Sequence, residues 1–436
     1  MHLTSLGCAK NQVDSEWMLG LFLARGHRLC QAPEEAEAII VNTCAFIESA
    51  VEEAIDAILE LSKARRGGCR LIVCGCLPER YGRDLAASLP EVDFFFGTGA
   101  YDRVVDALEA DTDTLDRCTL PPPESVRLDR AFTGRIWPRT GFAYLKTAEG
   151  CDRHCTYCII PRLRGRQMSR PLRDIVSEAS GLAASGAREL VLVGQETSAY
   201  GRDLSPGRNL TELLATLSDR LPSVWLRVLY LHPETVTPDL IRLVSERDNI
   251  CSYFDIPVQH AADSILKRMS RRHRSADLRR LFNDIRRVIP EATLRTTVMV
   301  GFPGESEADM DELMKFIQEI EFDHLGAFRY SDSEDIASHK LTGHVPDNVA
   351  AERFDRLMAA QARISSVRNR RHVGKTFPVL LETRAGDRIF EGRTMFQAPE
   401  VDGIIRVECR HPAAAGDVVL ARVTGAGEYD LTGKTV

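Results

Sequence analysis

The stretch Glu149-Gly150-Cys151-Asp152-Arg153-His154-Cys155-Thr156-Tyr157-Cys158 places three cysteines in a Cys-x3-Cys-x2-Cys spacing, just after an apolar run that begins at Phe142. Three thiolates packed this tightly can hold three corners of a four-iron cluster and leave the fourth iron without a protein ligand. An open iron can bind a substrate or a cofactor, whereas a fully ligated cluster mostly passes electrons. The alternative is a structural zinc knuckle with His154 as the fourth ligand, although zinc sites more often pair two Cys-x2-Cys units.

Length and composition predict a protein of two or three domains. The 436 residues exceed the roughly 250–300 at which single cores stop growing. No run approaches the roughly 20 apolar residues that span a bilayer, and the N-terminus shows no signal-peptide pattern, so we expect a cytoplasmic protein without a membrane partner. Twelve cysteines in a reducing compartment favour metal binding over disulfides, and the net charge of −7 argues weakly against nucleic acid as the main partner.

Residues 1–112 alternate strand and helix patterns, which predicts a doubly wound parallel sheet. Cysteines recur where the first three strands end, at Cys8, Cys44 and Cys76. Open parallel sheets bind their ligands at that edge, so these cysteines are candidates for a second site. Cys74 should still lie in the third strand and point into packing.

The remaining chain divides into three segments. Residues 113–138 contain Pro121-Pro122-Pro123 and little periodicity, and they are predicted to form a linker. Residues 139–372 contain six strand patterns separated by helical ones and end in a long helix, which indicates a partial α/β barrel with its active face at the carboxyl ends of the strands. Residues 373–436 are rich in β-branched residues and turn signals, and they predict a small antiparallel β-barrel.

A family resemblance covers almost the whole chain. Gly7-Cys8-Ala9-Lys10-Asn11, Asn42-Thr43-Cys44, Gly75-Cys76, the cysteine loop and the terminal β segment together resemble the methylthiotransferases. That family joins an N-terminal cluster domain, a radical S-adenosylmethionine barrel and a C-terminal TRAM domain. The resemblance implies two [4Fe-4S] clusters, each with one open iron. Their implied ligands are Cys8, Cys44 and Cys76 for one cluster and Cys151, Cys155 and Cys158 for the other.

The resemblance also implies a mechanism. The barrel cluster cleaves S-adenosylmethionine to a 5′-deoxyadenosyl radical that removes hydrogen from an unactivated carbon. The N-terminal cluster presents sulfur, which a second S-adenosylmethionine methylates, and the carbon radical takes the methylthio group. Tyr157 is expected to give backbone contacts to the adenine. Glu196 and Arg295 are candidates for the amino and carboxylate groups of the methionyl portion, with a salt bridge as the alternative for Arg295. No catalytic acid or base is assigned.

Several motifs are similar to the branch of the family that modifies a ribosomal protein, among them Tyr230-Leu231-His232-Pro233 and Ala398-Pro399-Glu400-Val401-Asp402-Gly403. The implied target is the β-carbon of an aspartate in small-subunit ribosomal protein twelve, either free or in the small subunit. Residues 373–436 hold eight Lys or Arg and nine Asp or Glu, whereas a TRAM domain docking on RNA should be basic. Binding to tRNA is therefore less favoured.

Two other functions stay open. One is the sibling branch that modifies adenosine in tRNA, and the other is a two-cluster electron-transfer module that would consume no S-adenosylmethionine. The sequence identifies neither the electron donor nor the sulfur source. Two stretches depart from the ribosomal branch: residues 333–337 stand where a Gly-Thr pair is common, and Glu196 stands where an aspartate is common.

Overall fold

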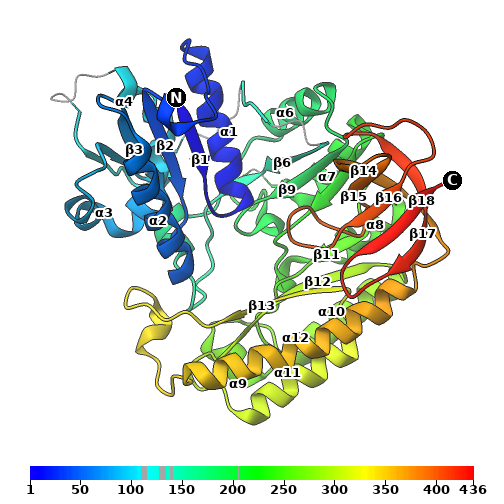
Figure 1. Cartoon of the computed structure of the whole chain (residues 1–436). Coiled ribbons are helices and arrows are strands. Elements are labelled where there is room, and N and C mark those ends of the chain that lie inside the picture. The colour runs from blue at the N-terminus through cyan, green and yellow to red at the C-terminus, as the bar shows by residue number, and fades with distance from the viewer. Residues whose placement is uncertain (110–114, 127–133, 138–140, 205) are drawn as a thin grey trace.

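The structure is a computed structural model that describes residues 1–109, 115–126, 134–137, 141–204 and 206–436. Three units follow one another along the chain (Figure 1): a parallel sheet with helices, a partial barrel and a small closed barrel. This order confirms the predicted fold class. No helix in the described ranges is long and apolar enough to cross a bilayer.

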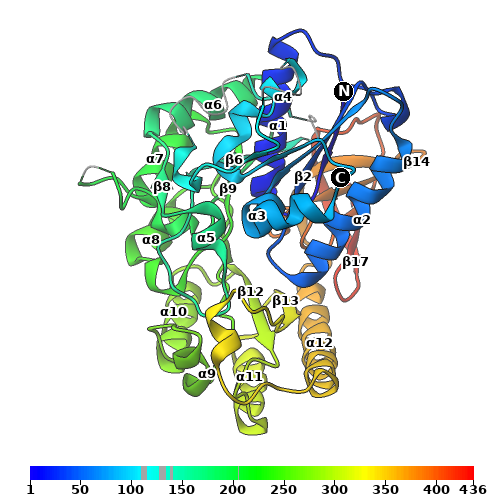
Figure 2. The same cartoon turned by 90° about the vertical axis from the view of Figure 1, so that its left-hand side faces the viewer.

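The N-terminal unit is a parallel sheet whose strands are β1 (His2–Ser5), β2 (Ala38–Thr43), β3 (Arg70–Gly75), β4 (Phe94–Phe96) and β5 (Cys118–Thr119). Its helical segments are α1 (Ala9–Ala24), η1 (Pro33–Glu35), α2 (Glu48–Ala64), α3 (Cys76–Ser88), η2 (Thr98–Arg103), α4 (Asp106–Glu109) and η3 (Pro123–Ser125). Helix α1 covers one face through Val13 and Phe22, and α2 and α3 cover the other through Ile58 and Leu85 (Figure 2). The parallel sheet with helices on both faces is as predicted, but its strands follow the order of the chain, without the reversal at a switch point that a doubly wound sheet has.

Strand β5 lies inside the segment predicted to be a linker. Phe95 and Phe96 pair with Cys118 and Thr119, so this part of the segment completes the sheet. Further along the segment, Arg135 is buried and pairs with Glu16 of α1, at 3.0 Å. Residues 113, 114, 127–133 and 138 of the predicted linker lie outside the described residues.

The central unit has six parallel strands in chain order: β6 (Phe142–Lys146), β9 (Glu189–Val193), β10 (Trp225–Val228), β11 (Tyr253–Asp255), β12 (Thr293–Val300) and β13 (His324–Arg329). Its larger helices are α6 (Leu172–Ala184), α7 (Leu210–Arg220), α8 (Pro238–Glu246), α9 (Asp263–Arg268), α10 (Ser275–Val288), α11 (Glu307–Ile320) and α12 (Asp347–Arg370). The outward side chains of the strands, such as Leu190 and Leu226, form the main core with these helices. The strands thus make a partial barrel.

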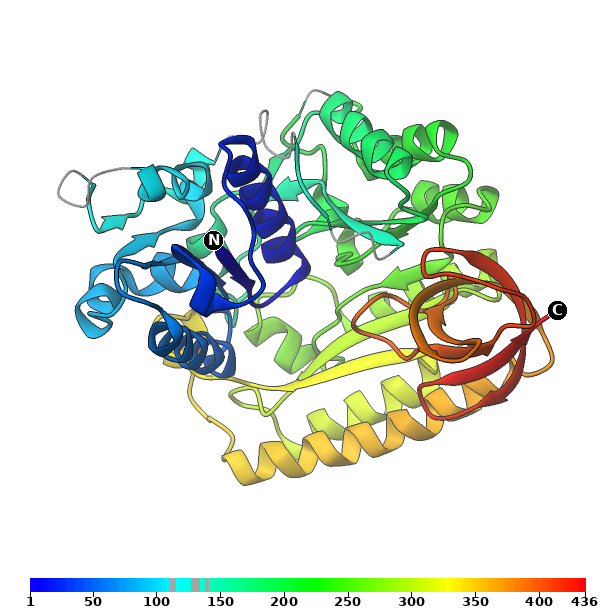
Figure 3. The same ribbon diagram turned by 45° about the horizontal axis from the view of Figure 1, so that its top comes forward.

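The C-terminal unit is a closed barrel of β14 (Thr376–Gly386), β15 (Ile389–Arg393), β16 (Ile405–Glu408), β17 (Val418–Ala426) and β18 (Leu431–Thr435). Figure 3 shows this unit beside the strands of the partial barrel. The loop between β15 and β16 reaches the inner side of those strands. Tyr144 donates to Glu400 at 2.7 Å, and Tyr253 donates to Asp402 at 2.6 Å. The motif that contains Glu400 and Asp402 therefore covers the inner side of β6 and β11.

Residues 333–337, which depart from the ribosomal branch, bind the partial barrel to the N-terminal unit. Asp335 binds Arg80 of α3 through two hydrogen bonds, of 2.6 and 2.9 Å, and Arg80 also reaches Ser333 at 2.8 Å. The hydrogen bonds from Arg80 lower the pKa of Asp335 to about 2. The charged pair therefore stabilises the docking of the N-terminal sheet on the barrel.

We expect Asp335→Asn to lower the free energy of unfolding by about 1 kcal/mol at neutral pH, because the pair is partly exposed. The folded pKa lies below the ordinary value of 3.8, so the stabilisation is present above pH 3.8 and is lost as the pH falls toward 2. Urea unfolding of both proteins between pH 7 and pH 3 measures the difference, which should shrink on acidification. A difference that stays constant over this range would contradict the role of the charge.

Candidate active site

The three N-terminal cysteines lie at one edge of the parallel sheet. Cys8 precedes α1, Cys44 follows β2, and Cys76 is the first residue of α3. Strands β1, β2 and β3 are neighbours, so the three thiols converge as predicted. Cys74 is fully buried inside β3, and its Sγ lies 3.9 Å from Sδ of Met18, which confirms that it packs in the core.

Two glycines make the approach of these cysteines possible. Gly7 has φ 93°, and a Cβ there would lie 2.6 Å from Cβ of Cys44. Gly75 has φ 100°, and a Cβ there would lie 2.5 Å from Oδ1 of Asn42. Both positions require a left-handed backbone and a close approach, which only glycine supplies without strain.

The surroundings of this triad favour the thiolate form at Cys8 and oppose it at Cys44 and Cys76. Burial opposes ionisation of the Cys8 thiol, but the ammonium of Lys10 and the guanidinium of Arg164 lower its pKa. Burial raises the pKa of Cys44, and it raises the pKa of Cys76 to about 12; in both cases the neighbouring thiols add to the rise. The three sulfurs are close enough to disfavour one another's charge, so binding of a metal cluster would release protons.

The second triad lies in a loop fixed at both ends. A short hairpin of β7 (Ala148–Glu149) and β8 (Met168–Ser169) forms its base, and the N–H of Cys151 donates to the carbonyl of Gly165 at 3.1 Å. Thr156 ties the middle of the loop to the end of α9, because its Oγ1 donates to the carbonyl of Arg268 at 2.9 Å. The loop therefore presents its cysteines from a held backbone at the carboxyl end of β6.

Burial also raises the pKa values in the second triad, to about 11 for Cys151 and to about 12 for Cys158. The thiol of Cys155 contributes to both rises, which places the three sulfurs near one another. The N–H of Arg153 points at Sγ of Cys151 at 3.4 Å, a contact that favours a thiolate.

The spacing of the sulfurs bears on the zinc alternative. Ligand atoms around one tetrahedral zinc lie roughly 4 Å apart, whereas thiolates on different irons of a four-iron cluster lie further apart. Within the described ranges, three His, Cys, Asp or Glu ligand atoms come within 4.8 Å of one another only in the group His232, Glu234 and His273. Neither cysteine triad, with or without His154, reaches that spacing. This spacing argues against a zinc knuckle at either triad.

The two triads are joined by the short helix α5 (Ile160–Arg164), which begins two residues after Cys158. Leu163 packs in the core of the N-terminal unit, and its carbonyl accepts a hydrogen bond of 2.6 Å from Thr98. Arg164 is buried, and its guanidinium donates a hydrogen bond of 2.9 Å to Asp14. Its charge also acts to lower the pKa of Cys76, against the effect of burial. The loop of the second triad thus runs directly to the first triad.

A cavity of about 510 Å³ lies beside the second triad, lined by Cys155, Arg153, Glu196, Arg271 and His232 among others. Glu196 is buried there and forms a bidentate ion pair with Arg153, at 2.7 and 2.9 Å. The position of Glu196 beside Cys155 is consistent with its expected role toward the methionyl amino group. The expected role itself stays a proposal.

Arg295 does not line this cavity. Its guanidinium binds Asp255 at 2.8 Å and lies 3.4 Å from Asp402 of the C-terminal unit. These carboxylates raise its pKa although burial opposes the charge. The structure shows the salt bridge that was the alternative for Arg295, and a contact with the methionyl carboxylate stays a prediction.

Tyr157 packs beneath the loop. Its ring meets Phe302 edge to face at a centroid distance of 6.4 Å, and its hydroxyl accepts a hydrogen bond of 2.7 Å from Arg271. The side chain is thus used in packing, and the expected backbone contact to adenine stays a prediction.

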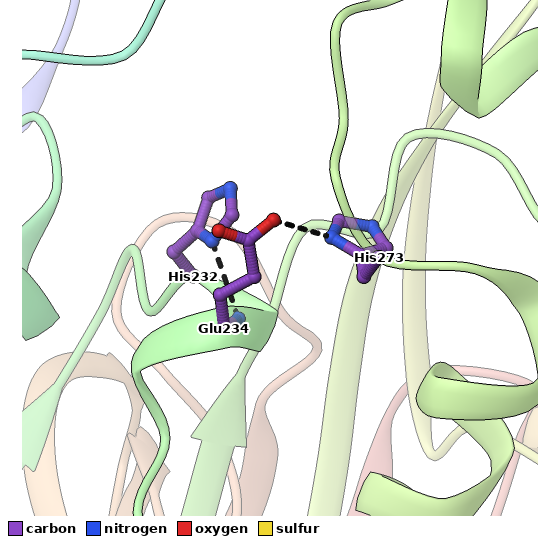
Figure 4. Close-up of side chains that lie close together, drawn as sticks. All are labelled: His232, Glu234 and His273. Carbon is purple, nitrogen blue, oxygen red and sulfur yellow. Dashed lines mark hydrogen bonds and ion pairs between the residues drawn. The ribbon is translucent and has the colours of Figure 1, made fainter.

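Figure 4 shows the group His232, Glu234 and His273, of which His232 and Glu234 line the cavity. Nδ1 of His232 accepts the N–H of Glu234 at 3.3 Å, so its Nε2 carries the proton and is no metal ligand in that tautomer. The carboxylate of Glu234 is bound by Arg153 at 2.6 Å. Burial and the nearby Arg271 lower the pKa of His273 to about 4. The guanidinium groups of Arg153 and Arg271 beside these side chains disfavour a cation here, and the group forms a polar wall.

Several buried charges near the triads were not predicted from the sequence. Lys146 binds Asp14 at 2.5 Å, and Glu149 also reaches Lys146 and Arg164. Lys10 lies next to Cys8. The sequence feature that could have indicated them is a charged residue within an otherwise apolar element, such as Lys146 at the end of strand β6.

Comparisons with known proteins fit this architecture. Residues 1–97 match the model of the uncharacterized protein family UPF0004, residues 145–317 match the radical SAM superfamily, and residues 373–436 match the TRAM domain. Among solved structures, a radical S-adenosylmethionine methyltransferase, TsrM from Kitasatospora setae, matches with a TM-score of 0.57 at 14% identity, over 75% of this chain and 74% of that one. The fold and the matched models define a radical S-adenosylmethionine enzyme, a class that implies a [4Fe-4S] cluster and S-adenosylmethionine.

Proteins of similar sequence show which radical S-adenosylmethionine enzymes the chain is related to. The chain is 60% identical to the ribosomal protein uS12 methylthiotransferase RimO of Desulfosudis oleivorans, over 100% of this chain and 99% of that protein. It is 43% identical to the protein of the same name from Clostridioides difficile, over 99% and 97% of the two chains. The chain belongs to the RimO family of radical S-adenosylmethionine methylthiotransferases.

Proposed function

We propose that this enzyme attaches a methylthio group to the β-carbon of an aspartate in ribosomal protein uS12, which is small-subunit ribosomal protein twelve. The observation that supports the proposal most is the pair of cysteine triads, one at the sheet edge and one at the mouth of the barrel, joined by α5. The names of the relatives support the substrate.

We propose Cys8, Cys44 and Cys76 as ligands of one [4Fe-4S] cluster and Cys151, Cys155 and Cys158 as ligands of the other. Three sulfur donors at each site, gathered at the end of β strands, support such groups. Bound there, the clusters would supply the electron that splits S-adenosylmethionine and the sulfur that is transferred.

The residues of the chain supply position and shielding. Glu196, held by Arg153, offers a carboxylate toward the methionyl amino group in the cavity beside Cys155. Arg164, between the triads, balances thiolate charge at the N-terminal site. The loop that carries Glu400 and Asp402 covers the inner side of the barrel and keeps water from it.

The experiment that tests the proposal uses anaerobically reconstituted protein with a strong reductant, sulfide, S-adenosylmethionine and either uS12 or small subunits. We expect a mass gain of about 46 Da on uS12, the excess of SCH3 over H, located on one aspartate by fragmentation. Modification of tRNA adenosine under the same conditions, with uS12 unchanged, would contradict the proposed substrate and favour the sibling branch.

A further inference from the structure

One buried cation of the described residues, Lys10, has no carboxylate partner, and the side chains that interact with its ammonium are the thiol of Cys8 and Tyr230. Lys10 is only 8% exposed. The other buried lysines and arginines of the described ranges each have a carboxylate within 4 Å, as Arg80 has Asp335 and Lys146 has Asp14. No carboxylate of the described residues comes within that distance of Lys10. Burying a charge without a carboxylate partner is costly, so the ammonium of Lys10 favours the binding of a further anion beside it.

The position of Lys10 is defined from two units. It lies two residues after Cys8 on the first turn of α1, and its Nζ lies 3.5 Å from the ring centroid of Tyr230. Tyr230 follows β10 at the carboxyl end of the barrel strands and has φ 62°, which is uncommon for a residue with a side chain. Its N–H donates to Asp255 at 2.8 Å, and its carbonyl accepts from Thr197 at 3.1 Å. These bonds hold the strained backbone and fix the ring under the ammonium.

Lys10 therefore lies where the N-terminal triad meets the mouth of the barrel. Thr197, which binds the Tyr230 backbone, directly follows Glu196, and His232 is two residues beyond Tyr230. Both Glu196 and His232 line the cavity beside Cys155. A group bound by Lys10 would thus lie next to Cys8 and near the cavity of the second triad.

We propose that Lys10 binds a carboxylate, and that this carboxylate is the side chain of the target aspartate. The inference rests on the proposed function and adds a specificity residue to it. The carboxyl carbon of aspartate is bonded to the β-carbon, so an ammonium that holds the carboxylate fixes the carbon to be modified one bond away. A charge-assisted hydrogen bond in a buried site is strong and discriminates against neutral analogues.

The test measures binding rather than turnover. Full-length reconstituted protein is titrated with a fluorescent uS12 peptide that contains the target aspartate, and with the same peptide carrying asparagine there. Wild type should prefer the aspartate peptide by roughly tenfold or more. Lys10→Met keeps an apolar stem over Tyr230 and should bind both peptides equally, at the wild-type affinity for the asparagine peptide. Lys10→Arg should retain part of the preference.

Lys63→Met is the matched control, since Lys63 is exposed on α2 of the same unit, and it should keep the full preference. An unchanged preference in Lys10→Met would overturn the inference. The inference would also be overturned if Lys10→Met lost affinity for S-adenosylmethionine but still discriminated between the peptides, because Lys10 would then bind the methionyl carboxylate. Loss of iron from the variant would overturn it too, because Lys10 would then balance the charge of a cluster. If wild type binds neither peptide, the proposed function fails, and not the assignment of Lys10 alone.

Discussion

Cys155→Ala is expected to abolish the reductive cleavage of S-adenosylmethionine. Cys155 is the middle cysteine of the barrel triad and also lines the cavity beside it. With only two thiolates left, the site should not hold a cluster with one open iron, so no electron can be delivered to the sulfonium. Under dithionite, formation of 5′-deoxyadenosine should fall to the level seen without protein.

Cys251→Ala is the control, because Cys251 is a buried cysteine of the same barrel that packs with Tyr253 and Leu229. It should retain cleavage. Substantial 5′-deoxyadenosine from the Cys155 variant would show that the barrel triad is not the site of cleavage.

Cys44→Ala is expected to separate the two halves of the reaction. Cys44 follows β2 in the N-terminal unit and belongs to the other triad. The variant should still cleave S-adenosylmethionine, because the loop of residues 151–158 is anchored by Gly165 and Arg268 rather than by Cys44. Its yield of methylthio product should fall below detection, because the site that presents sulfur is lost. Parallel assays of 5′-deoxyadenosine and of the uS12 mass measure both halves.

For this variant the matched control is Cys30→Ala, in the same unit but outside the triad, with its thiol directed at the carbonyl of Met1. Full methylthio transfer by the Cys44 variant would refute the division of labour between the triads.

Much of the site was predictable because local pattern decides it. The three-cysteine spacing is local, and the cysteines after β1, β2 and β3 follow from the rule that parallel strands end at one edge. Helix α6 (Leu172–Ala184) is one of the helical patterns predicted between the strands of residues 139–372. These features depend on residues that are close in the sequence.

The rest depends on contacts between distant segments. Arg295 looked available at a strand of the barrel, but Asp402, far along the chain, binds it. Arg164 follows the cysteine loop in the sequence, but its charge acts to lower the pKa of Cys76 in the N-terminal unit. The strand β5 was read as linker because its two paired residues are too few for a periodic signal. Packing between units decides each of these cases, and a single sequence does not display it.

The proposed function requires two iron clusters in this chain, each bound by three cysteines. Iron and sulfide analysis together with Mössbauer spectroscopy, after anaerobic reconstitution, measures their number. We expect about eight irons per chain in wild type and about four when either triad is replaced by alanine. About four irons in wild type, or zinc in both sites, would contradict this expectation.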